Sequence, residues 1–455
     1  MSLETLKALF EPNSVAVIGA SREPWKTGHI VFKNILEAGY RGKLYPINPK
    51  ADEILGIKAY PSIKNIPETV DLAVFVIPAR FVPSVLEEAG ESGVKAAIII
   101  SGGFAETDSE EGRKLQEEVV KVANKWGIRF VGPNCQGINN PHLGLCASWP
   151  LIKKAGPLAI ISQSGTVAAT FELWAEAEGI GISKMIALGN RADINEIDLL
   201  EYLGEDPNTK AIGMYLESVS NGKKFLEVAS EVSKKKPIVV LKSGRTASGA
   251  KAVASHTGSL AGEYNIYLAA FKKANVIPVD SIEELYDVTK GLALLPRPRG
   301  SNVLIITSSG GSGIISTDYS EQLGLKVTLL KEETVKALKE KLPPYCIIKN
   351  PLDLTGDATS DRYDKTLEEV VKDPNVDLVL TIFGDPIPGA SEVVEKYFNL
   401  GKTIIPIYLG GGGVEEEEKA KMHSKGIPVF PTPERGVRVA KAIYEYTKNL
   451  YKRKS

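Results

Sequence analysis

The chain has 455 residues, of which 43% are hydrophobic, and its 55 Lys and Arg nearly balance 56 Asp and Glu to give a net charge of −1. This balance is typical of an ordinary globular protein and excludes a strongly basic surface for nucleic acid. The length predicts about three domains of roughly 150 residues each.

The cysteines and the N-terminus indicate the compartment. Cys135, Cys146 and Cys346 show no CxxC spacing, so neither a disulfide framework nor a zinc site is expected. The N-terminus lacks the basic and apolar regions of a secretory signal, and the apolar runs are too short to span a membrane. We therefore expect a cytoplasmic protein with reduced thiols, no membrane association and no metal site in this chain.

Short β-branched runs alternate with longer amphipathic segments along the whole chain. This alternation predicts an α/β fold with parallel sheets and helical crossovers. Loop-like sequence around 139–142 and the Pro- and Gly-containing segment 295–300 mark two joints. The expected domains are therefore 1–140, 141–296 and 297–455.

The first predicted strand, VAVIGAS, leads through a loop to a helix start, where a phosphate can bind. The fingerprint G-x-G-x-x-G is absent, and Lys50 stands after the second strand where a dinucleotide site has an acid. NAD is therefore disfavoured, and NADP stays open. Beside the glycine turn at Gly19, the cations Arg22, Lys26 and Lys50 suit a ligand with additional phosphate groups.

Three further loops of this domain follow predicted strands, and they contain Pro78, Ser101, Gly102 and Asn134. Ligands bind at the carboxyl ends of parallel strands, so these residues are candidates for the same site. The alternative is turn chemistry alone, which Gly, Pro and Asn supply routinely.

In the second domain, the strand LAIIS is followed by a turn with Ser164, Gly165 and Thr166 and then by a helix start. Free N–H groups at such a start bind anions. The alternative role of Ser164 is helix capping, which is compatible with anion binding.

His256, in SHTGSLAG, has only small neighbours, and we expect it in an open loop. A neutral imidazole attacks phosphorus when its other nitrogen donates to an acceptor. Glu217 ends an apolar strand and is the candidate acceptor, unless it forms an ion pair with Lys242 or Arg245. A surface or structural histidine is the alternative role of His256.

In the third domain, the strand NVLIITS ends in a glycine-rich turn with Gly311, Ser312 and Gly313 before a helix start. The turn lacks Gly-Lys-Ser/Thr and is not a Walker A loop. It is a second candidate phosphate cradle.

Several of these segments occur in an order that resembles the succinyl-CoA synthetase superfamily. They are GAS, NPK, VIPA, ISGGF, VGPNCQG, SQSGT and SHTGSLAG. The motifs GN-x-AD at 189–193 and KSGRT at 242–246 are most similar to the α subunit of ADP-forming acetyl-CoA synthetases. The resemblance implies a Rossmann-like CoA-binding domain followed by two flavodoxin-like ligase domains.

The resemblance also implies roles for residues. The CoA phosphates lie near Ser21, Arg22 and Lys26, and the pantetheine arm passes Ser101, Gly102 and Asn134. His256 carries a phosphoryl group, Glu217 orients its ring, and the helix starts at 164–165 and 311–313 stabilise the phosphoryl group.

The implied reaction converts acyl-CoA, phosphate and ADP to acid, CoA and ATP through an acyl phosphate and phospho-His256. The sequence contains no ATP-grasp-like region, so a separate β subunit, in an α2β2 assembly, is expected to bind ADP or ATP and Mg²⁺. Two alternatives stay open: a related succinyl- or citryl-CoA ligase or lyase, and a non-catalytic CoA-binding regulator. The motifs do not fix the preferred acid, or ADP against GDP.

Overall fold

The computed structural model describes residues 3–257 and 264–454. By their internal contacts the residues divide into two compact units. Unit 1 consists of Met1–Ala177 and Gly181–Ile282, and unit 2 consists of Glu178–Ile180 and Glu283–Ser455. The limits of the three expected domains stay predictions.

The first sheet of unit 1 is parallel, with the strand order β2-β1-β5-β6-β7. Its central strands are buried throughout, because helices cover both faces. The strands are β1 (Ser14–Ile18), β2 (Lys43–Ile47), β5 (Leu72–Phe75), β6 (Ala96–Ile99) and β7 (Arg129–Val131). The helices are α1 (Leu3–Phe10), α2 (Thr27–Glu37), α3 (Val82–Glu91) and α4 (Glu110–Trp126), and a hairpin joins β3 (Glu53–Ile54) to β4 (Ile57–Lys58).

The second sheet of unit 1 has the order β14-β13-β12-β10-β11-β8-β9, in which β8 and β9 are antiparallel additions. Its strands are β8 (Gly137–Asn140), β9 (Leu145–Ala147), β10 (Ala155–Ser162), β11 (Ile182–Ala187), β12 (Ala211–Leu216), β13 (Ile238–Lys242) and β14 (Ile277–Val279). Its helices are α5 (Gly165–Ala177), α6 (Glu196–Glu205), α7 (Gly222–Lys235), α8 (Ala247–Thr257) and α9 (Tyr264–Ala274).

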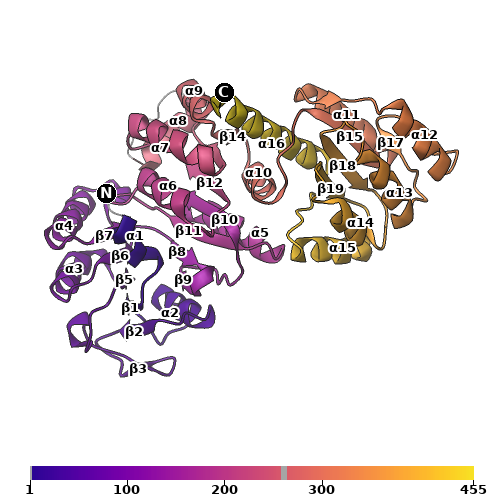
Figure 1. Ribbon diagram of the computed structural model, residues 1–455. Coiled ribbons are helices and arrows are strands. Elements are labelled where there is room, and N and C mark those ends of the chain that lie inside the picture. Colours follow the sequence, from indigo (N-terminus) through magenta and orange to yellow (C-terminus); the bar gives the residue numbers. More distant parts are fainter. Residues whose placement is uncertain (1–2, 258–263, 455) are drawn as a thin grey trace. The chain divides into compact units, whose positions relative to one another are not determined.

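One hydrophobic core runs through both sheets of unit 1. It contains Val17 and Val74 of the first sheet together with Ile161 and Ile212 of the second. Helices α1 and α2 contribute Phe10 and further residues to it, and α2 packs against β9 (Figure 1). The two sheets are therefore built as one body.

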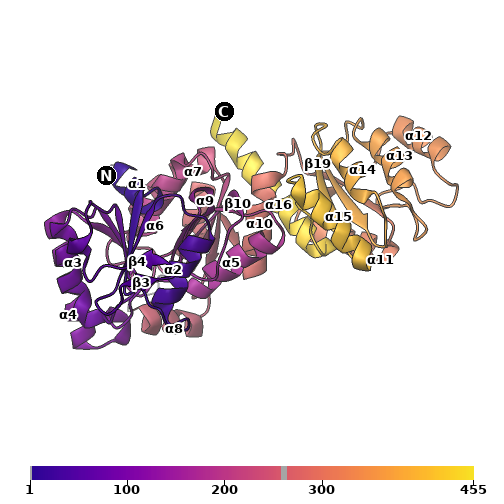
Figure 2. The same cartoon turned by 90° about the horizontal axis from the view of Figure 1, so that it is seen from below.

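Unit 2 contains the parallel sheet β16-β15-β18-β19, with β17 also paired to β15. Helices α11 and α16 pack together on one side of this sheet, and α14 and α15 lie on the other (Figures 1 and 2). The strands are β15 (Asn302–Thr307), β16 (Lys326–Val327), β17 (Leu352–Asp353), β18 (Leu378–Phe383) and β19 (Thr403–Tyr408). The helices are α10 (Ile282–Leu294), α11 (Gly310–Gln322), α12 (Glu332–Lys341), α13 (Ser360–Val370), α14 (Ala390–Tyr397), α15 (Gly412–Ser424) and α16 (Pro433–Lys454).

The three sheets share one feature of strand order. In each, the first of the parallel strands lies between the next one and a later one: β1 lies between β2 and β5, β10 between β11 and β12, and β15 between β16 and β18. This is the flavodoxin-like reversal of winding, and ligands bind in the crevice at its carboxyl edge. The predicted α/β fold is confirmed. Across the described part of the chain, no helix is both long and apolar enough to cross a membrane.

A buried ion pair joins β11 to the residue that follows α6. Lys184 Nζ lies 3.1 Å from the carboxylate of Asp206, and both side chains are at most 2% exposed. The Thr209 hydroxyl also donates to Asp206 at 2.6 Å. Burial raises the pKa of Asp206. The Thr209 hydrogen bond and the charge of Lys184 outweigh burial, so the pKa lies below its ordinary value.

We expect Asp206→Ala to destabilise the protein by about 3 to 5 kcal/mol, because it leaves the buried Lys184 ammonium without its carboxylate. Glu205→Ala is the matched control, since it removes the exposed neighbouring pair with Lys235 and should cost at most about 1 kcal/mol. Urea unfolding of both variants measures the difference. Equal losses of unfolding free energy in the two variants would contradict the assignment of Lys184–Asp206 as the structural pair.

Candidate active site

The loop after β1 lies directly against the first turn of α2. Gly19 has φ +93°, and a Cβ there would lie 2.2 Å from the carbonyl oxygen of Val76. A Cβ on Gly28 would lie 2.0 Å from the carbonyl oxygen of Gly19. His29, buried on α2, has Nδ1 2.8 Å from the carbonyl oxygen of Ser21. Both glycines are therefore required for the close approach of loop and helix.

The three predicted cations of this loop region are exposed. Arg22 donates to the carbonyl oxygen of Lys50 at 3.3 Å, and Lys26 pairs with Glu23 at 2.6 Å. The Asn48 amide donates to the loop after β1 and accepts from the N–H of Lys50, each at 2.8 Å. The loops after β1 and β2 thus form one cationic edge.

The loops after β5, β6 and β7 meet at the same edge. The buried Ser101 hydroxyl accepts from the N–H of Ile77 at 3.1 Å, and the N–H of Asn134 donates to the carbonyl oxygen of Ser101 at 2.9 Å. Pro78, Gly102 and Asn134 are exposed, and Asn134 has φ +56°. The structure therefore brings these predicted residues together.

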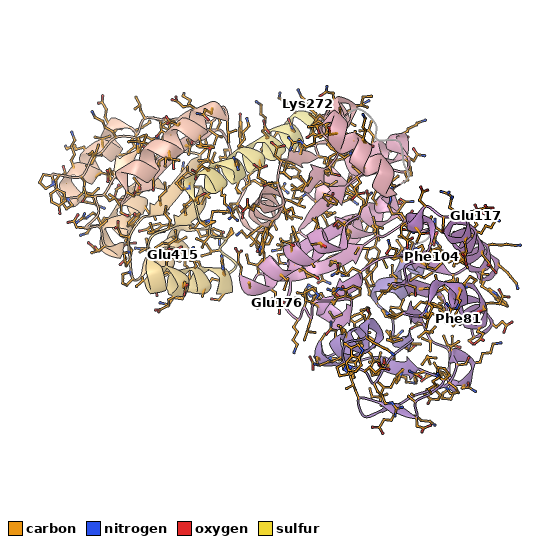
Figure 3. The ribbon with its side chains drawn as sticks, turned by 180° about the vertical axis from the view of Figure 1, so that it is seen from behind. Phe81, Phe104, Glu117, Glu176, Lys272 and Glu415 are labelled. Atoms are coloured by element: carbon orange, nitrogen blue, oxygen red, sulfur yellow. The ribbon has the colours of Figure 1, made fainter. Side chains whose placement is uncertain are left out.

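Glu106 fixes the glycine loop after β6 and was not predicted. Its carboxylate accepts from the N–H groups of Gly103 at 2.6 Å and Phe104 at 3.1 Å, and from the Asn190 amide at 2.6 Å. Burial raises the pKa of Glu106. These hydrogen bonds outweigh burial, so the pKa lies below its ordinary value. Phe104 is buried inside unit 1 (Figure 3). A carboxylate three residues after a glycine is the local signal that could have indicated this turn.

The GN-x-AD motif joins the two sheets of unit 1. Gly189 has φ +57°, and a Cβ there would lie 2.3 Å from the carbonyl oxygen of Pro133. The N–H of Asn190 donates to this same oxygen at 2.9 Å. The Asp193 carboxylate accepts from Nε of Arg129 on β7, at 2.8 Å to each oxygen. The motif therefore holds the loop after β7 against the second sheet.

The cradle after β10 is held by two hydroxyl groups. Ser162 Oγ donates to the carbonyl oxygen of Ser164 at 2.6 Å and accepts from its N–H at 3.1 Å. Ser164 Oγ accepts from the N–H of Val167 at 3.4 Å, so that Ser164 also acts as the predicted cap of α5. Gly165 and the exposed Thr166 form the first turn of α5.

Glu217 follows β12, beside the cradle across the switch point, and is 6% exposed. The Tyr215 hydroxyl donates to its carboxylate at 3.4 Å. Lys242 Nζ donates to the main-chain carbonyl oxygen of Glu217 at 2.7 Å, and Arg245 pairs with Asp280 at 2.6 Å. Burial lowers the pKa of Lys242 to about 8, although the charge of Glu217 opposes this shift.

The expectation that His256 lies in a loop is wrong. Its backbone belongs to the last turn of α8. This helix begins at Ala247, where the N–H of Gly249 donates to the Thr246 hydroxyl at 3.1 Å. The alanine-rich sequence before His256 favours a helix more strongly than its small side chains favour a loop. The His256 side chain and residues 258–263 lie outside the described residues.

The cradle of unit 2 repeats the hydroxyl pattern of the cradle after β10. Thr307 Oγ1 donates to the carbonyl oxygen of Ser309 and accepts from its N–H, both at 2.9 Å. Ser309 Oγ accepts from the N–H of Ser312 at 3.4 Å. Gly311, Ser312 and Gly313 lie in the first turn of α11, as the sequence predicts.

Glycine- and hydroxyl-rich loops before helix N-termini bind anionic groups, so the three switch points are suited to phosphates. Among residues 3–257 and 264–454, no three His, Cys, Asp or Glu side chains come together as possible metal ligands.

Family comparisons define the class of protein. Residues 13–141 match the family described as CoA binding domain, residues 155–292 the succinyl-CoA ligase like flavodoxin domain, and residues 303–452 the ligase-CoA domain. The chain therefore carries a CoA-binding domain and two domains of CoA ligases.

Individual relatives narrow this class. The chain is 44% identical over 455 residues to the α subunit of acetate–CoA ligase (ADP-forming) I of Pyrococcus furiosus, with 98% of each chain covered. It is 42% identical over 449 residues to acetate–CoA ligase (ADP-forming) I of Archaeoglobus fulgidus, covering 97% of this chain and 64% of that protein. The chain belongs to the family of ADP-forming acetate–CoA ligase α subunits.

A solved structure agrees with this membership. Acetyl-coenzyme A synthetase 1 of Ca. Korarchaeum cryptofilum, in complex with phosphate and ADP, has a TM-score of 0.91 at 37% identity. The match covers 98% of this chain and 97% of that chain.

We expect Gly28→Ala to weaken CoA binding at least tenfold, or about 1.4 kcal/mol, because the added Cβ pushes the loop after β1 away from α2. Isothermal titration with CoA measures the affinity. Gly222→Ala is the control, since a Cβ there meets no atom within 4 Å. Unchanged affinity in a folded Gly28→Ala protein would show that the close approach of loop and helix does not shape the CoA site.

Proposed function

We propose that the chain converts an acyl-CoA and phosphate to an acid, CoA and phospho-His256. In the first step a phosphate oxygen attacks the thioester carbonyl, the C–S bond breaks, and CoA leaves as its thiol after protonation. In the second step a His256 ring nitrogen attacks phosphorus, and the acid leaves as carboxylate. The phosphoryl group then passes to ADP, which regenerates His256.

This proposal depends most on the position of Glu217 in the structure, together with the chain's membership of this ligase family. The carboxylate is buried at the carboxyl end of β12, across the switch point from the Ser164 cradle. In the proposed site the Glu217 carboxylate accepts a hydrogen bond from a ring N–H of His256, and this bond stabilises the imidazolium character during attack. The first turn of α5, with Ser164, Gly165 and Thr166, stabilises the transferred phosphoryl group.

The proposed CoA site is the carboxyl edge of the first sheet. Arg22, Lys26 and Lys50 are exposed cations beside a glycine loop, which suits the phosphate groups of CoA. Ser101, Gly102 and Asn134 would line the pantetheine arm. Gly19 and Ser21 lie in the loop after β1, and Pro78 lies in the loop after the neighbouring strand β5. Gly311, Ser312 and Gly313 of unit 2 are proposed as a second anion cradle.

The proposed partner is an ATP-grasp β subunit that binds ADP or ATP with Mg²⁺, in an α2β2 assembly in the cytoplasm. The chain covers 64% of the longer Archaeoglobus fulgidus protein, and the named α subunit of Pyrococcus furiosus has the same extent as this chain. The part of the Archaeoglobus fulgidus protein that this chain does not match is the proposed counterpart of the β subunit. Acetate is the first acid to test, because both relatives are named for it.

A related succinyl- or citryl-CoA enzyme, or a regulator that only binds CoA, would use the same folds. The combination of His256, the buried Glu217 and both cradles favours catalysis over regulation, because CoA binding alone requires none of them. Turnover with acetate, succinate and citrate separates the enzyme classes.

Labelling of the enzyme tests the intermediate. We expect the chain, incubated with its β partner, Mg²⁺ and γ-labelled ATP, to acquire an acid-labile, base-stable phosphoryl group that His256→Ala abolishes. His142→Ala, which alters an exposed histidine near the Gly156 carbonyl oxygen, should label normally. Equal labelling of His256→Ala and wild type would overturn the proposal.

Glu217→Gln tests the orienting carboxylate. We expect the labelling rate to fall about 10²- to 10⁴-fold, because an amide does not stabilise the imidazolium character. Quenched-flow measurement of phosphohistidine formation gives the rate, and Glu176→Gln on the exterior of α5 is a control (Figure 3). A rate within twofold of wild type would remove Glu217 from the mechanism.

A further inference from the structure

The main chain of Glu217 and Ser218 is held by buried side chains from other elements. Gln163 Oε1 accepts from the N–H of Glu217 at 2.7 Å and from the N–H of Ser218 at 3.1 Å. Gln163 Nε2 donates to the carbonyl oxygen of Ser218 at 2.8 Å, and Lys242 Nζ donates to that of Glu217 at 2.7 Å. Every N–H and C=O of this dipeptide therefore has a side-chain partner.

Arg191, from the GN-x-AD motif, reinforces the same dipeptide. Its guanidinium donates to the carbonyl oxygen of Ser218 at 3.2 Å and to the Ser218 hydroxyl at 2.7 Å. The fully buried Glu196 accepts from Arg191 at 2.9 Å, and its other oxygen accepts from the Ser220 N–H at 2.7 Å. The segment after β12 is thus fixed on both sides of Glu217.

Placing these groups in the interior carries a desolvation cost, which their hydrogen bonds to the main chain of Glu217 and Ser218 offset. Lys242 is 2% exposed and Gln163 is 8% exposed. The ammonium of Lys242 faces the Tyr267 ring, 4.5 Å from its centroid, and two main-chain carbonyl oxygens, those of Glu217 and Ser243. An apolar side chain would fill the same space without desolvating a charge. Such perturbed buried groups cluster at functional sites.

We propose that Gln163 and Lys242 are positioning residues of phosphoryl transfer, which fix the Glu217 carboxylate relative to the α5 cradle and to the strand that leads into α8. This inference rests on the proposed function.

The chain connections support the assignment. Gln163 directly precedes Ser164, which caps α5, so one amide ties Glu217 to the proposed phosphate cradle. Lys242 is the last residue of β13, which leads into the helix that carries His256. Gln163 and Lys242 therefore connect the Glu217 main chain to the cradle at the start of α5 and to the strand that leads into α8. Displacements of about 1 Å in such a constellation reduce rates as much as 10²-fold.

The test uses the reconstituted enzyme with acetate, CoA, ATP and Mg²⁺. Gln163→Met and Lys242→Met should lower kcat and the rate of His256 labelling about 10- to 100-fold, with the KM values for CoA and acetate unchanged. Lys242→Arg, which keeps a charged donor, should recover part of the loss. Gln163→Glu keeps the acceptor oxygen but lacks the amide N–H groups, so its kcat should lie between those of wild type and Gln163→Met. This variant also tests the inference if Gln163→Met does not fold.

Thr209→Val is the matched control, because it removes a buried hydrogen bond of the same domain away from the switch point. It should lower the unfolding temperature and leave kcat unchanged. Folded Lys242→Met and Gln163→Glu enzymes with kcat within twofold of wild type would overturn the inference. A wild-type enzyme that fails to label at His256 would instead overturn the proposed function, so the two failures are distinguishable.

Discussion

The hydrogen bonds between the Gln163 amide and the main chain of Glu217 and Ser218 join the two loops at which the second sheet reverses its winding. A parallel sheet directs the carboxyl ends of its strands to one edge, but it does not by itself fix one loop relative to the next. Side-chain bonds to main-chain groups do so here, because the Gln163 amide holds the backbone of Glu217 and Ser218 against the loop after β10. The support acts on the main chain, and the proposed role in phosphoryl transfer belongs to the Glu217 carboxylate.

The same principle connects the two sheets of unit 1. Asn190 donates both to the Glu106 carboxylate, which closes the glycine loop after β6, and through its N–H to the loop after β7. The next residue, Arg191, binds Ser218 beside Glu217. Two adjacent residues of one motif therefore connect the proposed CoA edge with the proposed phosphoryl site. The shared hydrophobic core makes this connection rigid.

Features encoded within a few residues were predictable from the sequence. The strand–loop–helix rhythm predicted the α/β fold, and the turns with Ser164 and with Gly311 to Gly313 predicted helix starts, because periodicity and turn composition are local. The contacts of Gln163, Asn190 and Lys242 join residues far apart in the sequence, so no local pattern indicates them. His256 shows the limit of local reasoning within one segment, since the alanines among the small residues that suggested a loop are also good helix formers.

The two cradles use glycine for different reasons. At Gly165 a Cβ would lie 2.4 Å from Oε1 of Gln136, so a side chain there would require the Gln136 side chain to move. At Gly311 a Cβ would meet no atom of the described residues within 4 Å, and its φ is not in the left-handed region. Neither packing nor backbone conformation within unit 2 thus accounts for glycine at 311. The anion proposed to bind at the first turn of α11, where N–H groups lack intrahelical partners, would account for it, because a side chain there would hold the anion away from the backbone.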